Sequence, residues 1–143
     1  MATFVESQGT CWSLPGDMAT VEADGTIKVL GRGSLSINTG GERVFPDEVE
    51  AAVKAHPDVV DAIVVGVPDE RFGERVVAVI EARPGATLGT EDLRKVCKDK
   101  LTGIPRQVVT VDRVQRSPSG KPDYPWAKQV AVDAINNSTT PGV

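Results

Sequence analysis

Two continuous apolar runs of strand length occupy the middle of the chain. They span residues 62–67 and 76–80, and the turn-rich segment 68–73 joins them. Strands that read as unbroken apolar runs, without alternating polar positions, are typical of sheets covered on both faces. A third β-like run spans residues 108–114. The pattern therefore predicts a small sheet that is buried between other elements.

A hairpin pattern precedes this region. Residues 18–23 and 26–30 are β-like runs that flank Asp24-Gly25. Asp-Gly between two such runs indicates a hairpin, because the tight turn requires positive φ angles. We therefore expect a two-stranded ribbon that leads to Arg32. Residues 1–15 show no clear pattern, and we expect them to be irregular.

Helical spacing begins at Pro46, a residue type that is favoured in the first turn of a helix. The helix should end near His56, because Pro57 disfavours helical geometry in the residue before it. His56 is therefore interpreted as a helix-end residue rather than a catalytic base. Glu48 and Glu50 are interpreted as acids on the helix surface. The apolar face consists of Val49, Ala52 and Val53.

Two further helical segments follow. Thr90 can cap a helix that has an acidic first turn and carries Cys97 on its apolar stripe. Residues 122–134 are compatible with a helix interrupted at Pro125, and the polar tail from residue 136 is expected to be disordered. Together these patterns predict an α+β domain, in which a small sheet with a β-hairpin is covered by two or three helices.

The composition changes this picture little, but it excludes some functions. The 143 residues are 40% hydrophobic and 25% charged, as in an ordinary globular domain. A net charge of -4 argues against a general polyanion binder, and only 4% of the residues are aromatic, which disfavours base stacking. A nucleic-acid-binding domain is therefore a weak alternative. A local site for one phosphate stays open.

Cysteine, histidine and hydropathy give further limits. A disulfide between Cys11 and Cys97 is possible, but a reduced pair fits an intracellular chain better. His56 is the only histidine, so no metal-binding spacing exists. No apolar run reaches the length of a membrane span, and the N-terminal residues show no signal-peptide core. We expect a cytoplasmic protein, with peripheral membrane attachment left open.

Lys121 is the candidate side chain for binding a phosphate or a carboxylate. It follows Gly120 in the polar loop of residues 116–121. A lysine in such a loop offers a compact positive charge. The loop is not a Walker A motif, because Gln115 and Pro122 stand where that motif requires Gly and Ser or Thr. Judged without other evidence, therefore, Lys121 is interpreted as an ordinary loop lysine that is exposed to solvent.

The segment Gly31–Glu50, GRGSLSINTGGERVFPDEVE, supplies a more specific signal. It combines an arginine, a flexible Gly-Ser pair, a glycine loop and an acidic helix start. This order closely resembles the hinge and glycine loop of the acyl-CoA synthetases, which belong to the adenylate-forming superfamily together with the adenylation domains and luciferases. The resemblance covers roughly residues 16–128. It implies the fold of the C-terminal lid domain of a fatty-acid–CoA ligase.

The resemblance also implies a role for individual residues. Gly120-Lys121 matches the family's Gly-Lys, whose lysine contacts the substrate carboxylate and the α-phosphate of ATP, so Lys121 is the candidate catalytic residue. Asp17 and Arg32 match the residues that bind the nucleotide ribose. Ser34 matches the hinge, where many members have Asp or Lys.

Three more positions match the part of the family that handles the thiol substrate. Gly40 and Gly41 match the loop that lines the pantetheine channel. Arg43 matches a basic residue near the nucleotide or CoA phosphates. The implied reaction is activation of a carboxylic acid, expected to be a fatty acid, by ATP with Mg²⁺, followed by transfer of the acyl group to CoA.

The resemblance implies that the chain is part of a larger enzyme. It lacks the Ser/Thr/Gly-rich phosphate loop followed by Pro-Lys that the family carries in a large N-terminal domain, which is the expected partner. We expect no ATP, Mg²⁺ or CoA bound to this chain alone. The alternative is a free-standing binding or regulatory module without catalysis. The expected divisions are 1–15, the end of a missing N-terminal domain or a disordered stretch; 16–32, a hairpin leading to the hinge; 33–130, the C-terminal α+β domain; and 131–143, a flexible tail.

Overall fold

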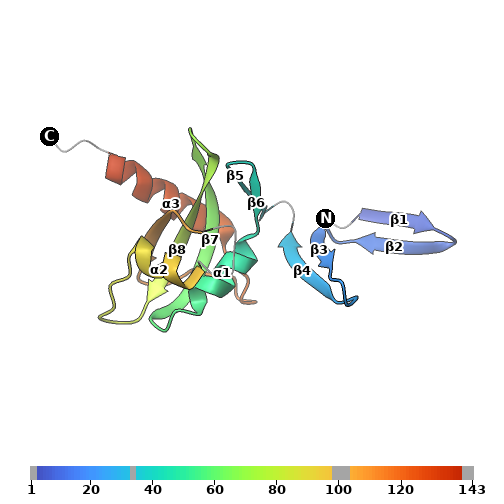
Figure 1. Ribbon diagram of the computed structural model, residues 1–143, viewed down its shortest axis with the longest axis horizontal. Helices are drawn as coiled ribbons and strands as arrows, with labels where there is room; N and C mark the ends of the chain where they lie inside the picture. Colours follow the sequence, from blue (N-terminus) through green and yellow to red (C-terminus); the bar gives the residue numbers. More distant parts are fainter. Residues whose placement is uncertain (1–2, 33–34, 98–103, 140–143) are drawn as a thin grey trace.

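The computed structural model describes residues 3–32, 35–97 and 104–139 (Figure 1). The elements in chain order are β1 (Thr3–Ser7), β2 (Thr10–Leu14), β3 (Asp17–Val21), β4 (Ile27–Arg32), β5 (Ile37–Thr39), β6 (Glu42–Val44), α1 (Pro46–Lys54), β7 (Val59–Asp69), β8 (Gly73–Ala82), α2 (Thr90–Cys97), β9 (Gln107–Val111) and α3 (Tyr124–Thr139). The buried core lies from β5 onward, while the β1–β2 and β3–β4 hairpins extend to one side. The α+β fold predicted from the sequence is confirmed.

β7 and β8 form the centre of the larger sheet. They pair antiparallel along their length, with Val65 opposite Val77, and a short turn joins Asp69 to Gly73. On its other side β8 contacts β5 at Thr39 and runs parallel to β9. The predicted strands at the two central apolar runs are confirmed. The third run is shorter than predicted, because β9 ends at residue 111.

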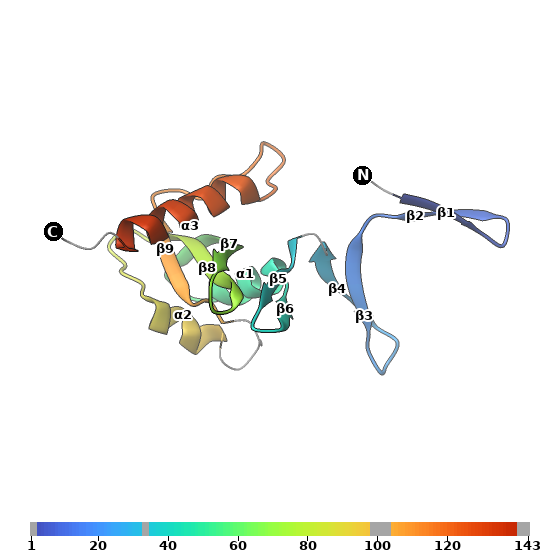
Figure 2. The same cartoon turned by 90° about the horizontal axis from the view of Figure 1, so that it is seen from above.

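Helices cover both faces of this sheet (Figure 2). Val64 faces a cluster that includes Val53 of α1 and Leu93 of α2, whereas its neighbour Val65 faces a cluster that includes Ala127 of α3. Successive side chains of a strand point to opposite faces, so a doubly covered strand buries every position. This packing explains why the two central runs carry no polar alternation.

The ends of α1 follow the sequence prediction. The helix begins at Pro46, and after its last turn His56 N donates to the Val53 carbonyl oxygen at 3.1 Å. His56 Nδ1 then accepts a hydrogen bond from Asp58 N at 3.1 Å. These contacts close the helix and start the next turn. His56 is therefore a helix-end residue, as predicted.

The two N-terminal hairpins differ in how well the sequence reveals them. The predicted ribbon is confirmed as β3–β4, with Asp24 Oδ1 accepting from Thr26 N at 2.9 Å in the turn. The prediction of an irregular stretch over residues 1–15 is wrong for the described part. Gln8 and Gly9 take φ angles of 51° and 77°, which allow a tight turn between β1 and β2.

The C-terminal helix is longer and more regular than predicted. Asp123 Oδ1 accepts from Trp126 N at 3.0 Å, so Asp123 caps the start of α3. Pro125 then lies in the first turn, where the missing N–H costs nothing. The predicted interruption at Pro125 is wrong, and so is the predicted disorder from residue 136 as far as residue 139. Cys11 is exposed and Cys97 is buried, and both are free thiols.

Candidate functional site

One cavity brings together three of the predicted site residues. Asp17, Arg32 and Lys121 line a cavity of about 410 Å³, together with Asp47 and Tyr124. These side chains come from β3, the end of β4, the start of α1 and the segment that leads into α3. Residues separated by roughly a hundred positions in the sequence thus face one space.

The β3–β4 ribbon holds Asp17 and Arg32 side by side. The two residues are direct partners in the antiparallel register, and Arg32 Nε lies 3.9 Å from Asp17 Oδ1. The side chains are 65% exposed for Arg32 and 46% exposed for Asp17, so their ion pair contributes little to stability. Both groups are accessible to a ligand. Ser34, the predicted hinge, lies outside the described residues.

The loop before α3 presents Lys121 on a fixed backbone. Ser117 N donates to the Lys121 carbonyl oxygen at 2.9 Å, and Lys121 N donates to Ser117 Oγ at 3.1 Å. Gly120 has a φ of 83°, which only glycine adopts without strain. The Lys121 side chain itself is exposed. The loop therefore fixes the backbone and leaves the ammonium group accessible.

Gly40, Gly41 and Arg43 lie apart from this cavity, on the β5–β6 hairpin. The glycines have φ angles of 59° and 86°, as a tight two-residue turn requires. Gly40 N donates to the Phe72 carbonyl oxygen at 2.9 Å, which ties this turn to the β7–β8 turn. None of the three lines the cavity that Lys121 faces. The predicted site residues thus form two separate groups.

A partly buried hydrogen-bond network extends from the wall of the cavity into the domain, and the sequence prediction missed it. The Tyr124 hydroxyl lies 3.2 Å from both Asp47 Oδ1 and Glu50 Oε1 and can donate to either. Val64 N also donates to Glu50 Oε1, at 2.9 Å. Glu50 is only 5% exposed, so its interpretation as a surface acid is wrong. The partly buried Glu48 instead pairs with Lys28 at 2.9 Å.

Burial perturbs the titration of this network. It raises the pKa of Glu50 from 4.5 to about 7, against the opposing hydrogen bonds from Val64 N and the Tyr124 hydroxyl. Burial and then the charge of Glu50 also raise the pKa of Tyr124. Tyr124 therefore remains a neutral donor at physiological pH. Perturbed groups beside a cavity are typical of functional sites.

The part of the chain that the structure describes shows neither a metal centre nor a helix that could span a membrane. No cluster of three or more His, Cys, Asp or Glu side chains there is arranged to hold a metal ion. None of the described helices is long and apolar enough to cross a membrane. The cavity that Lys121 faces, lined by two cationic and two carboxylate side chains, is the candidate site because it brings the predicted residues together.

Comparison with known proteins gives consistent matches. The family described as AMP-binding enzyme C-terminal domain matches residues 48–121. The 3-oxocholest-4-en-26-oate–CoA ligase of Rhodococcus rhodochrous is 58% identical over 129 residues, which are 89% of this chain and 23% of that protein. A Mycobacterium tuberculosis ligase, named for medium/long-chain fatty acids and 3-oxocholest-4-en-26-oate, is 54% identical over 89% of this chain and 24% of its own.

A solved structure agrees with these matches. The ATP-bound crystal structure of MatB from Rhodopseudomonas palustris superposes with a TM-score of 0.73 and 30% sequence identity, covering 90% of this chain and 26% of that one. The chain thus spans about a quarter of the length of the proteins that it matches.

Proposed function

Because the chain belongs to the AMP-binding enzyme C-terminal domain family, we propose that it is the C-terminal domain of an acid–thiol ligase. The complete enzyme would use ATP to convert a carboxylic acid to an acyl-adenylate and would then transfer the acyl group to CoA. The observation that carries this proposal is the shared cavity of Asp17, Arg32 and Lys121. Adenylate formation requires groups that bind the ribose and a cation that binds the phosphate. Asp17 and Arg32 would bind the ribose, and Lys121 would bind the phosphate.

In the first half-reaction the carboxylate oxygen attacks the α-phosphorus of ATP, and the bond to the β-phosphate oxygen breaks to release pyrophosphate. Negative charge shifts among the oxygens around the α-phosphorus during this step. The exposed Lys121 ammonium would stabilise that charge from its fixed loop. The Asp17 carboxylate can accept hydrogen bonds from both ribose hydroxyls, and Arg32 lies beside it.

In the second half-reaction the CoA thiol loses its proton to solvent and its sulfur attacks the acyl carbon; the bond from that carbon to the AMP phosphate oxygen breaks, and AMP leaves. We assign this step to a second orientation of the domain, which it would reach by rotating about Ser34. The Gly40-Gly41 turn would then line the channel for the pantetheine arm, and Arg43 would contact a phosphate. These three residues lie apart from the Lys121 cavity, which supports the assignment of the two half-reactions to different groups of residues.

The partner of the domain would be a large N-terminal region of the same enzyme. Phe4, Trp12 and Leu14 on the β1–β2 hairpin are each more than half exposed, and an isolated domain gains nothing from exposing them. We assign these side chains to contact with that region. Mg²⁺ would accompany the ATP phosphates. The names of the relatives favour a fatty acid or a sterol-derived acid as the acyl donor.

Substitution of Lys121 in the complete ligase tests this proposal. Lys121→Ala should slow acid-dependent ATP–pyrophosphate exchange on the order of a hundred- to a thousand-fold. Thioester formation from a synthetic acyl-adenylate should change far less. Lys128→Ala, an exposed lysine on α3, serves as the matched control and should leave both half-reactions intact. Equal losses in the two half-reactions for Lys121→Ala would contradict its role. A complete chain with no adenylating activity would favour the non-catalytic module.

A further inference from the structure

The guanidinium group of Arg116 holds the loop that carries Lys121. Arg116 Nη1 donates to the carbonyl oxygen of Gly120 at 3.1 Å, one residue before Lys121. Arg116 and Pro122 also form a β-bridge, which closes the base of the loop. The side chain of Arg116 therefore contacts the loop near its tip, and its backbone contacts the loop at its base.

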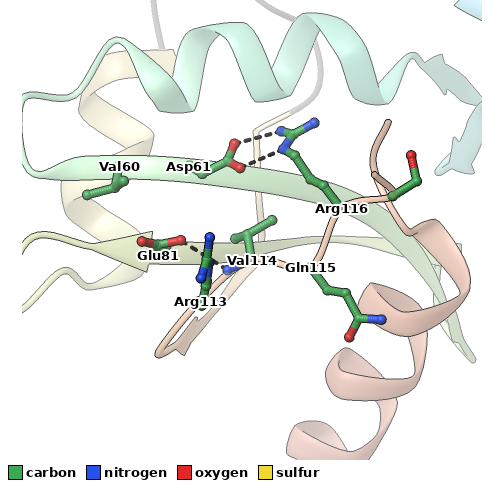
Figure 3. A pocket seen from close by; sticks show the side chains of 8 residues that line it. Val60, Asp61, Glu81, Arg113, Val114, Gln115 and Arg116 are labelled. Carbon is green, nitrogen blue, oxygen red and sulfur yellow. Dashed lines mark hydrogen bonds and ion pairs between the residues drawn. The ribbon is translucent and has the colours of Figure 1, made fainter. Parts of the chain in front are cut away.

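Asp61 fixes that guanidinium group on the sheet. Arg116 Nε and Nη2 donate to Asp61 Oδ2 and Oδ1, both at 2.6 Å, in a bidentate pair that lines a second cavity of about 670 Å³ (Figure 3). The side chains are 26% and 21% exposed, so solvent screens the pair only partly. The guanidinium holds the pKa of Asp61 below its ordinary value, mainly through these hydrogen bonds. Asp61 thus remains ionised at neutral pH.

Asp61 is part of the central sheet. Asp61 lies on β7, the strand that α1 and α3 cover from opposite faces, and Ala62 N donates to its Oδ1 at 2.8 Å. A chain of short contacts therefore runs from the buried sheet through Asp61 and Arg116 to the Gly120 carbonyl. The Lys121 ammonium would otherwise depend on an exposed loop for its position. A misplacement of about 1 Å in a reacting group can cost on the order of a hundred-fold in rate.

We propose that Arg116 is a positioning residue for adenylation: anchored by Asp61, it sets the backbone at Gly120 so that Lys121 reaches the reacting phosphate. This inference rests on the proposed function of Lys121. It assigns Arg116 no contact with substrate. Its effect should consequently pass through Lys121 alone, which separates it from a residue that merely stabilises the fold.

A double-mutant cycle in the complete ligase tests the inference. Arg116→Ala should slow acid-dependent adenylation on the order of ten- to a hundred-fold, leave the KM for ATP within about twofold, and leave thioester formation from synthetic acyl-adenylate unchanged. In a Lys121→Ala background the same substitution should cost less than about twofold, because the lysine that it positions is absent. Enzyme-excess single turnovers make the slow variants measurable.

Further variants keep the inference testable if Arg116→Ala fails to fold. Asp61→Asn keeps an oxygen for Ala62 N but removes the charge and one acceptor, and Arg116→Lys keeps the charge but cannot form the bidentate pair. Both should slow adenylation severalfold with an unchanged circular dichroism spectrum. Arg113→Ala is the matched control, because this exposed arginine lines the same cavity as Arg116, and its adenylation rate should be unchanged (Figure 3).

The outcomes separate the two proposals. If Lys121→Ala abolishes adenylation while folded Arg116→Lys and Asp61→Asn retain full activity, the positioning role is wrong and the proposed function stands. If the losses from Arg116→Ala and Lys121→Ala multiply, Arg116 acts independently of Lys121 and the inference is also wrong. If Lys121→Ala has no effect on adenylation, the proposed function itself fails.

Discussion

Replacement of Glu50 by glutamine should remove a pH-dependent cost from the folded state. Burial raises the pKa of Glu50 from 4.5 to about 7. This difference of 2.5 units corresponds to about 3 kcal/mol by which ionised Glu50 destabilises the fold. Glutamine keeps an oxygen that can accept from Val64 N and the Tyr124 hydroxyl, and it carries no charge.

The sign follows from the direction of the shift. Below pH 4.5 Glu50 is protonated in both states, and the folded protein pays no cost for its charge. As the pH rises from 4.5 to 7, the unfolded chain ionises first, so the folded state loses stability progressively. Integration between pH 5 and pH 8 gives a loss of about 2.5 kcal/mol for the parent protein relative to Glu50→Gln.

Urea unfolding of this chain at pH 5 and pH 8 measures the difference. With a urea m-value of about 2 kcal/mol/M, the unfolding midpoints of the two proteins should move apart by roughly 1 M between these pH values, with Glu50→Gln the more stable at pH 8. Glu70→Gln is the control, because Glu70 is exposed, and its midpoint should follow that of the parent protein. If the midpoints of the parent protein and Glu50→Gln instead shift in parallel between the two pH values, burial does not raise the pKa of Glu50.

Two further outcomes are expected. Ser34→Pro in the complete ligase should slow thioester formation more than adenylation, because proline would fix φ at the residue that we propose as the pivot; untouched thioester formation in a pre-steady-state assay would rule out that role. The chain alone should show a cooperative thermal transition in calorimetry that millimolar ATP or CoA does not shift, since on the proposed function its site residues supply only one wall of the nucleotide site; a saturable shift would favour an autonomous nucleotide-binding protein.

The sheet and α1 could be predicted because their patterns are local. The central runs of β7 and β8 are apolar at every position, which only a doubly covered strand tolerates. Pro46 and Pro57 bracket α1 in the sequence as they do in the structure. The Asp24-Gly25 turn likewise carries its own conformational requirement.

The predictions for Glu50, Pro125 and the first two strands are wrong, because the structure there depends on features that one residue or a simple apolar pattern does not show. Glu50 lies four residues after Pro46 and three before Val53, which places it on the buried stripe of α1 despite its charge. Pro125 does not interrupt α3, because Asp123 caps the helix and thereby places Pro125 in its first turn. The β1 and β2 strands are exposed on both faces, so no apolar alternation marks them.

The geometry of the candidate site exceeds what residue patterns can predict. Lys121 alone reads as a solvated loop residue, and only the family resemblance connected it with Asp17 and Arg32. Their shared cavity depends on how the β3–β4 ribbon sits against α1, where Lys28 pairs with Glu48. The pairing of Arg116 with Asp61, across 55 positions, is equally non-local.

Acyl-CoA formation by a fused enzyme tests the proposed function in one experiment. This chain would replace the matching segment of the Rhodococcus rhodochrous ligase, and the product from 3-oxocholest-4-en-26-oate, ATP and CoA would be compared with that of the relative truncated before this segment. The account predicts that the truncated protein forms no thioester, that the fusion restores its formation, and that Lys121→Ala in the fusion lowers it on the order of a hundred-fold or more. A folded fusion that is as inactive as the truncated relative would contradict the account.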